Sequence, residues 1–255
     1  MEQQPAFNAI NHDLTIFGGE NTTNFTVAVA AYACPSDPDS GRPRPIPAGV
    51  LLPRTPDPAS GPFQMIFTSY AGCSGSYDVN AIPRPAGGCV VDGRLIAQSD
   101  GVFSDVAPIS MASITDGLSQ TLFVTERATV NLRSLAAIDP RFYQERGWWI
   151  PGNRGATIMT TFYPPGMPTK VARAAGGTHA SAASSTHPGG FSALLGDGSV
   201  RFIKDTIATW PFGAATGRPI GAERASGGWW RNMPLPSVWQ ALGTRAGGEV
   251  IESDF

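Results

Sequence analysis

His187 is the residue of this chain whose type and position best suit chemistry. It directly precedes the bend Pro188-Gly189-Gly190, and nine residues separate it from the Asp197-Gly198 pair. An imidazole in this place could transfer protons or bind a metal ion. A zinc site would need further ligands at motif spacing, and neither His12 nor His179 supplies them. We therefore expect the His187 ring to hold the bend through hydrogen bonds to the backbone.

Four Asp-Gly pairs offer carboxylate oxygens, the ligand type that calcium prefers. The pairs begin at residues 92, 100, 116 and 197. Asp116 and Asp197 are weak calcium candidates, because no Asp-x-[Asp/Asn]-x-[Asp/Asn]-Gly loop with a distal glutamate accompanies them. Turn formation at Asp116-Gly117 and Asp197-Gly198 explains the pairs more simply. We expect no cofactor and no metal, with calcium as the alternative.

Two glutamates follow apolar or glycine-rich segments. Glu126 ends an apolar strand pattern, and Glu249 follows Gly247-Gly248. A catalytic carboxylate pair needs a second acid opposite the first, which nothing in the sequence places there. We expect both glutamates to form structural ion pairs with arginine, and the candidates are Arg127, Arg201 and Arg245.

The sequence lacks the motifs of common enzyme classes. Gly72-Cys73-Ser74-Gly75-Ser76 does not match the Gly-x-Ser-x-Gly elbow of serine hydrolases. Neither a phosphate-binding loop nor a dinucleotide fingerprint occurs. No convergent nucleophile and base can be named, so we expect that the protein is not an enzyme.

Tryptophan pairs could contact a ligand or a partner. All six tryptophans lie in the C-terminal half, with adjacent pairs at Trp148-Trp149 and Trp229-Trp230. Neighbouring residues on a strand point to opposite faces, so one member of each pair can face outward. Trp149 and Trp230 are therefore candidates for stacking on a sugar ring or a subunit, although half-buried packing is the simpler fate of each.

The three cysteines allow two interpretations. Cys73 and Cys89 flank a fifteen-residue loop, and a disulfide between them would stabilise the fold by roughly 3 kcal/mol in an oxidising compartment. Cys34 would then be left over. Alternatively, all three are reduced and buried as small hydrophobic residues.

A hairpin must position His187 and Asp197. Two apolar segments flank Asp197-Gly198, which is the strongest short-range signal for a two-residue type I′ turn. That turn pairs Leu195 with Val200 and Ala193 with Phe202. The core side of the hairpin is then expected to carry Phe191, Ala193, Leu195, Val200 and Phe202.

The segment from His187 to Ile203 resembles the His-x(9)-Asp-Gly signature of a large family of bacterial pilin-like proteins, described as prepilin-type and processing-associated. Five further segments are similar to the family pattern and occur in its order: Cys34-Pro35-Ser36-Asp37-Pro38, Ser69-Tyr70-Ala71-Gly72, Asp100-Gly101-Val102-Phe103, 114–122 and 242–249. Family members normally begin with a prepilin leader and a long apolar helix. The resemblance therefore implies that this chain starts after that anchor.

The resemblance implies a non-enzymatic structural protein of a pilus, a secretion-type filament or another extracytoplasmic assembly. Its partners would be further copies of itself or other pilin-like proteins. Because the family has at times been labelled solute-binding, the alternative is an extracytoplasmic solute- or glycan-binding module that uses Trp149 and Trp230.

Composition favours a β-rich fold with many turns. Glycine (30) and proline (23) are frequent, while charged residues, at 15%, fall below the roughly 25% of typical soluble domains. We expect a mainly β, α+β fold with minor helix, in which hairpins build an antiparallel sheet. One pilin-like domain should span 1–255, with an extended Pro-rich excursion at 34–62 and the signature hairpin and C-terminal segment at 184–255.

Charge and hydropathy exclude two partner classes. A net charge of −2 provides no field for nucleic acid. No window of eighteen apolar residues is present, so we expect no membrane span in this chain.

Local patterns predict five further elements. Asp92-Gly93 should form a second hairpin, and residues 148–150 and 157–163 should be strands. A short helix within 131–146 should end at Asp139-Pro140. Ser237 should cap a helix through Leu242.

Overall fold

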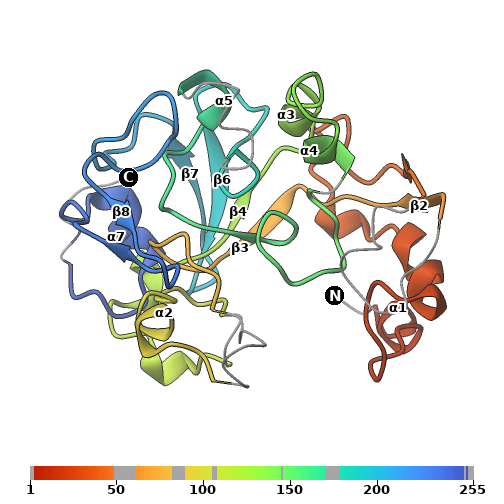
Figure 1. The fold of residues 1–255 in the computed structure, drawn as a ribbon, viewed down its shortest axis with the longest axis horizontal. Helices are drawn as coiled ribbons and strands as arrows, with labels where there is room; N and C mark the ends of the chain where they lie inside the picture. Colours follow the sequence, from red (N-terminus) through yellow and green to blue (C-terminus); the bar gives the residue numbers. More distant parts are fainter. Residues whose placement is uncertain are drawn as a thin grey trace.

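A five-stranded sheet forms the centre of the protein, as seen in a computed structural model that describes residues 3–48, 61–81, 90–104, 108–144, 146–170, 179–249 and 251 (Figure 1). The strand order is β5-β3-β4-β6-β7, and only the β3–β5 pair is parallel. The five strands are β3 (Tyr70–Cys73), β4 (Leu122–Glu126), β5 (Ile158–Met159), β6 (Gly190–Leu195) and β7 (Val200–Lys204).

Two small antiparallel sheets lie outside this centre. One pairs β1 (Arg44–Ile46) with β2 (Phe63–Met65), and the other pairs β8 (Glu223–Arg224) with β9 (Trp230–Arg231). The predicted mainly β, α+β class is confirmed, with one parallel pair added to the antiparallel arrangement.

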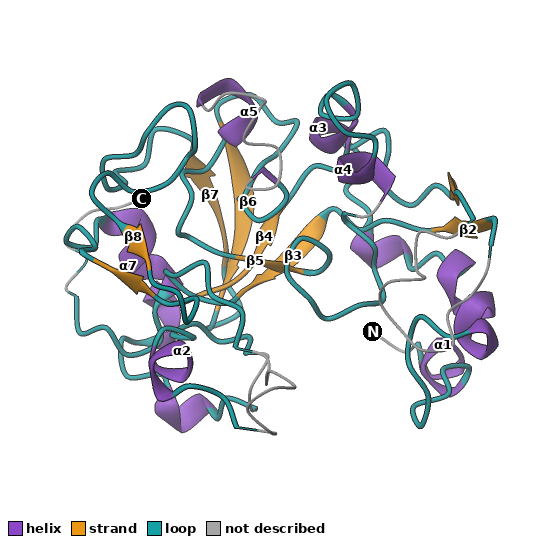
Figure 2. Cartoon of the chain, in the orientation of Figure 1, coloured by secondary structure: helices purple, strands orange, loops and turns teal. Residues whose placement is uncertain are grey.

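Helices are short, and loops make up much of the ribbon (Figure 2). The α-helices are α1 (Gln4–Asn8), α2 (Gly93–Ala97), α3 (Val130–Arg133), α4 (Arg141–Gln144), α5 (Met167–Lys170) and α7 (Val238–Gly243). The 3₁₀ helices are η1 (Gly19–Thr26), η2 (Ala30–Tyr32), η5 (Met111–Ser113) and η6 (Leu118–Gln120). In the described ranges, no helix is long and apolar enough to cross a membrane.

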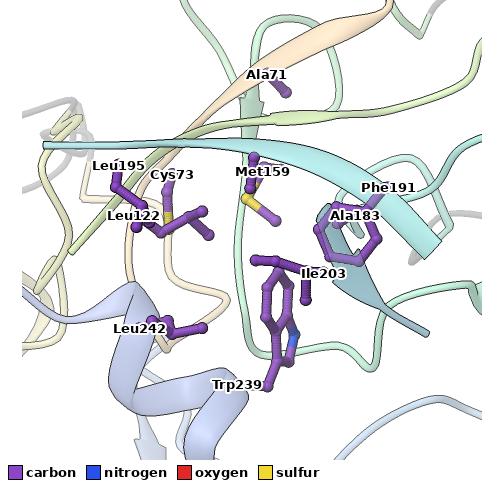
Figure 3. Close-up of a cluster of buried hydrophobic side chains, with 11 residues drawn as sticks. Ala71, Cys73, Leu122, Met159, Ala183, Phe191, Leu195, Ile203, Trp239 and Leu242 are labelled. Carbon is purple, nitrogen blue, oxygen red and sulfur yellow. The ribbon is translucent and has the colours of Figure 1, made fainter. Parts of the chain in front are cut away.

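One face of the central sheet packs on α7. Trp239 and Leu242 project from α7 toward strand residues that include Leu122 and Ile203 (Figure 3). The Trp239 indole Nε1 donates a hydrogen bond to the Tyr163 carbonyl at 2.9 Å, so its polar atom is satisfied inside the core. Each large apolar side chain buried here contributes roughly 1.5–3 kcal/mol.

The predicted hairpin forms, but the predicted register differs from the observed one by one residue. Leu194 pairs with Val200 and Ser192 with Phe202, because Gly196, Asp197 and Gly198 form a three-residue loop. Gly198 alone of these three has a positive φ, of 85°, as in a type I turn followed by a left-handed glycine. A shift of one residue turns β7 over. Ile203 is therefore buried on the α7 side, whereas Val200 and Phe202 are exposed.

The predicted Pro-rich surface excursion at 34–62 is wrong for residues 34–48. Asp37, Arg44 and Ile46 are buried there, and β1 pairs with β2. The guanidinium of Arg44 lies 3.7 Å from the centre of the Phe67 ring, so stacking draws this polar segment inward. Residues 49–60 lie outside the described part of the chain.

Four local predictions are corrected, and the helix after Ser237 is confirmed. Asp92 caps α2 by accepting a hydrogen bond from Arg94 N, so Asp92-Gly93 begins a helix instead of a hairpin. Residues 148–150 make only an isolated bridge to Phe67. The strand predicted at 157–163 is limited to β5, and the helix predicted within 131–146 is two short helices. Ser237 precedes α7 as predicted, although its side chain makes no capping hydrogen bond. The single domain at 1–255 stays a prediction.

Candidate functional site

Three side chains of different chemistry converge beside the sheet. Cys34 follows η2, Glu126 ends β4, and His187 lies in the bend before β6. The Glu126 Oε1 atom lies 3.2 Å from His187 Nε2 and 3.4 Å from Cys34 Sγ. The distance between His187 Nε2 and Cys34 Sγ is 3.7 Å. We call Cys34, Glu126 and His187 the thiol–carboxylate–imidazole cluster.

Backbone contacts hold each member of the cluster. The second carboxylate oxygen of Glu126 accepts a hydrogen bond from Ser192 N at 2.7 Å, which ties β4 to β6. The Thr186 hydroxyl donates to the Ser36 carbonyl at 2.9 Å, so the segments of His187 and Cys34 are joined. The cluster is therefore held in place by its surroundings.

Asp37 fixes the Cys34 segment more firmly. Its buried carboxylate accepts hydrogen bonds from Ser69 Oγ (3.1 Å), Thr129 N (2.6 Å), Thr129 Oγ1 (2.9 Å), Asp39 N and Val130 N (3.2 Å each). Apart from Asp39 N, which belongs to the same loop, these donors lie just before β3 and around the start of α3. The Cys34-Pro35-Ser36-Asp37 segment is thereby fixed to the end of β4.

The free thiol is not an activated nucleophile. Burial, and next the neighbouring Glu126, raise the pKa of Cys34 above its ordinary value. Burial, and next Cys34 and Glu126, also raise the pKa of the Tyr70 phenol. A catalytic thiol needs a lowered pKa, which an electropositive site supplies. At neutral pH the Cys34 thiol therefore stays protonated and donates to Glu126.

The geometry also differs from a nucleophile–histidine–acid relay. In such a relay the nucleophile and the acid contact opposite nitrogens of the imidazole. Here Cys34 and Glu126 both face Nε2 of His187. The recess beside the cluster, which Cys34, Asp37, Ser69 and Glu126 line among others, is narrow. The three atoms converge on one point, as the ligands of an ion do.

Two predictions about these residues are wrong. The His187 ring contacts Glu126 and Cys34 instead of holding the bend through backbone groups. Glu126 binds these partners and Ser192 N, and no arginine is among its described contacts. The motif search found no companion for His187 because its companions lie 61 and 153 positions away in sequence.

Asp116 and Glu249 meet at a second cluster. The Asp116 carboxylate accepts hydrogen bonds from Gly247 N at 2.7 Å and Gly248 N at 2.9 Å. The Thr244 hydroxyl contacts both Asp116, at 3.1 Å, and Glu249, at 3.3 Å. Gly117 has a φ of 92°, which lets the chain turn directly after Asp116.

Arg245 joins this second cluster to Asp100. The guanidinium donates to the carbonyls of Ser99 and Gly101 at 2.6 and 2.7 Å. The Asp100 carboxylate accepts from Ser76 N at 2.8 Å and Ser76 Oγ at 2.6 Å. Arg245, one of the three candidate ion-pair partners of the two glutamates, therefore binds backbone carbonyls in the described contacts.

The weak calcium candidates have other partners. Both oxygens of Asp116 accept backbone N–H groups. Asp197 Oδ1 accepts from Ser199 N at 2.9 Å and Ser199 Oγ at 2.6 Å, and these hydrogen bonds lower the pKa of this exposed carboxyl. Turn and loop formation accounts for both residues without an ion.

The two tryptophans named as candidates for a ligand or partner contact differ in burial. Trp230 is only 3% exposed, and its Nε1 donates to the Asp78 carbonyl at 2.8 Å, so its outward placement is wrong. Its ring lies 4.6 Å from that of Phe162, which explains its burial. Trp149 is half-buried and borders a groove with Tyr32 and Phe7.

Cys34 belongs to the thiol–carboxylate–imidazole cluster, whereas Cys73 lies in the hydrophobic core. Cys73 is free and fully buried in the α7-facing core, where burial raises its pKa to about 12. This agrees with the interpretation of Cys73 as a small buried hydrophobic residue. The proposed partner Cys89 lies outside the described residues.

Comparison with known proteins gives one match. Residues 1–209 match a family described as "Protein of unknown function (DUF1559)". Searches of curated proteins and of solved structures found no match. The matched range includes Cys34, Glu126, His187 and the hairpin. Since it also covers most of the chain, this protein belongs to the DUF1559 family.

Proposed function

We propose that this protein is a non-enzymatic, pilin-like structural protein that assembles with further copies of itself outside the cytoplasm of a bacterium. The proposal depends chiefly on one observation, a sheet face that exposes the apolar side chains of Val200 and Phe202 at its edge strand. The resemblance of the His187–Ile203 segment to pilin-like proteins supports the same function. Extracytoplasmic location follows from that resemblance.

This sheet face lies opposite α7. Val124 pairs with Leu194, and Leu194 pairs with Val200, so these three side chains form one row across the sheet. Phe202 lies on the same face of β7 as Val200. Phe103 extends the row, because its ring packs directly over Gly72, the partner of Val124. We call these five residues the open sheet face: Phe103, Val124, Leu194, Val200 and Phe202.

The most exposed side chains of the open sheet face lie on its edge strand, β7. Val200 is 68% exposed and Phe202 is 50% exposed, and β7 is an edge strand of the sheet. Exposed apolar side chains beside unpaired strand edges favour association with another chain. The small net charge of −2 causes little repulsion between copies. A second copy of this chain is therefore the occupant that we assign to the open sheet face.

Light scattering across a concentration series, followed by electron microscopy, tests the proposal. We expect the average mass to rise with concentration and micrographs to show regular filaments or rings. A monomer at all concentrations, with dispersed single particles in the micrographs, would contradict self-assembly.

A second candidate is glycan binding at the groove beside Trp149. This groove has a volume of about 400 Å³, and its aromatic lining is Phe7, Tyr32 and Trp149. Aromatic faces stack on sugar rings. Calorimetry against a glycan panel should give heat that Trp149→Ala abolishes. Heat that the variant retains, or no heat from any glycan, would remove this candidate.

A further inference from the structure

The thiol–carboxylate–imidazole cluster carries an inference beyond assembly. We propose that Cys34, Glu126 and His187 bind one divalent transition-metal ion, with zinc as the best fit, through Sγ, Oε1 and Nε2. No single segment of sequence holds this site, since its ligands come from the N-terminal loops, from β4 and from the bend before β6.

The distances between the three donor atoms match a tetrahedral site. Zinc lies about 2.3 Å from sulfur and about 2.0–2.2 Å from nitrogen or oxygen, which places ligand atoms at tetrahedral angles roughly 3.3–3.6 Å apart. The observed separations are 3.2, 3.4 and 3.7 Å. An ion among these atoms therefore requires only small shifts of the side chains.

The donor types select the class of metal. Calcium and magnesium prefer oxygen ligands, whereas one sulfur, one nitrogen and one oxygen suit zinc and related transition metals. Bound metal would take the place of the proton that Cys34 donates to Glu126, because thiolate is the form that ligates. Binding therefore releases one proton from the Cys34 thiol.

The surroundings are those of a prepared site. Ser192 N holds the oxygen of Glu126 that does not face the cluster, so Oε1 is oriented toward the other two ligands. Such outer contacts orient metal ligands and strengthen binding. The His187 side chain is 34% exposed, so an ion can reach the cluster from the His187 side.

Bound metal would connect three parts of the fold that are distant in sequence. Glu126 lies opposite Tyr70 and next to Ser192, and Ser192 pairs with Phe202 of the open sheet face. The site therefore lies on the same face of the sheet as the proposed assembly surface. Metal binding itself needs only a single chain, so its test is independent of assembly.

The test uses the full chain, freed of metal with a chelator and kept reduced. Calorimetry with zinc should give one site per chain. Cobalt(II) should give the visible bands of tetrahedral coordination together with a thiolate charge-transfer band in the near ultraviolet. Cys34→Ser should lose the charge-transfer band. His187→Gln and Glu126→Gln should weaken zinc binding by at least about ten-fold, the loss that removal of even an outer-shell partner causes.

His12→Gln is the matched control, because His12 is exposed and should bind zinc as the wild type does. His187 is partly exposed, so His187→Gln should fold even if a buried variant does not. Zinc should raise the melting temperature of wild type and of His12→Gln, and should raise that of His187→Gln clearly less at the same zinc concentration. An absence of zinc binding to wild type, or equal affinity in His187→Gln, would overturn the proposal.

Discussion

Buried Asp37 joins the Cys34 segment to two other parts of the chain. Its carboxylate accepts five hydrogen bonds, four of them from donors before β3 and around the start of α3 and one from Asp39 N in its own loop. The segment similar to the family pattern at Cys34–Pro38 thus has a structural reason: it places Cys34 beside Glu126. Conformation at this segment, and with it the geometry of the cluster, depends on Asp37.

Asp37→Ala should lower the free energy of unfolding by about 3 kcal/mol, because buried N–H and O–H donors lose a charged acceptor. Urea denaturation measures the loss. Asp13→Ala, at an exposed residue, is the control and should change stability by less than about 0.5 kcal/mol. A similar small change in both variants would show that Asp37 does not hold this segment.

Asp100 should make stability depend on pH. Burial raises the pKa of Asp100 from 3.8 to about 6, against the lowering effects of the hydrogen bonds from Ser76 and of Arg245. The folded state then holds the proton more tightly than the unfolded state. The contribution of Asp100 is therefore complete below about pH 4 and is lost as the pH rises through about 6.

Asp100→Asn removes this titration. Between pH 4 and pH 7, the stability of wild type relative to Asp100→Asn should fall by up to about 3 kcal/mol. Urea denaturation of both proteins at several pH values measures the difference. A difference that stays constant with pH would mean that Asp100 titrates normally in the folded protein.

The site could not be predicted from sequence at the scale of single residues. The sequence names His187 as a candidate and places Glu126 at the end of an apolar strand, but their contact depends on how β4 and β6 pair. Cys34 enters only through the turns that Asp37 fixes. Local motif spacing contains no signal for contacts across 61 to 153 positions.

At the scale of elements, the β6–β7 hairpin shows what a turn motif can and cannot predict. Asp-Gly fits the centre of a two-residue type I′ turn and equally the last two positions of a three-residue loop. The hairpin itself was therefore predictable, whereas its register was not. The register decides that Val200 and Phe202 face solvent, which makes the open sheet face.

Gly198→Ala should destabilise the hairpin by about 1 kcal/mol, because its φ of 85° strains a residue with a side chain. No atom lies within 4 Å of an added Cβ there, so backbone strain is the whole effect. Gly93→Ala is the control, since Gly93 begins α2 with equally open space and no positive φ. Thermal melts should show a lower melting temperature for Gly198→Ala and not for Gly93→Ala. An equal decrease in both variants would contradict the loop geometry.

The molecule as a whole has a sheet with two unlike faces. One face is sealed by α7 through Trp239 and Leu242, and the other exposes apolar side chains at the edge strand β7. Composition predicted the short strands and many turns. It could not predict which face is covered, because that depends on the register of a single hairpin.

Sedimentation velocity of wild type and of the double variant Val200→Lys/Phe202→Lys tests the assembly surface most directly. Leu235→Lys, at another exposed apolar residue, is the matched control. We predict that wild type and Leu235→Lys sediment as oligomers at high concentration, while the double variant stays monomeric and keeps its melting temperature. Unchanged oligomers in the double variant, or monomers in all three proteins, would contradict the account.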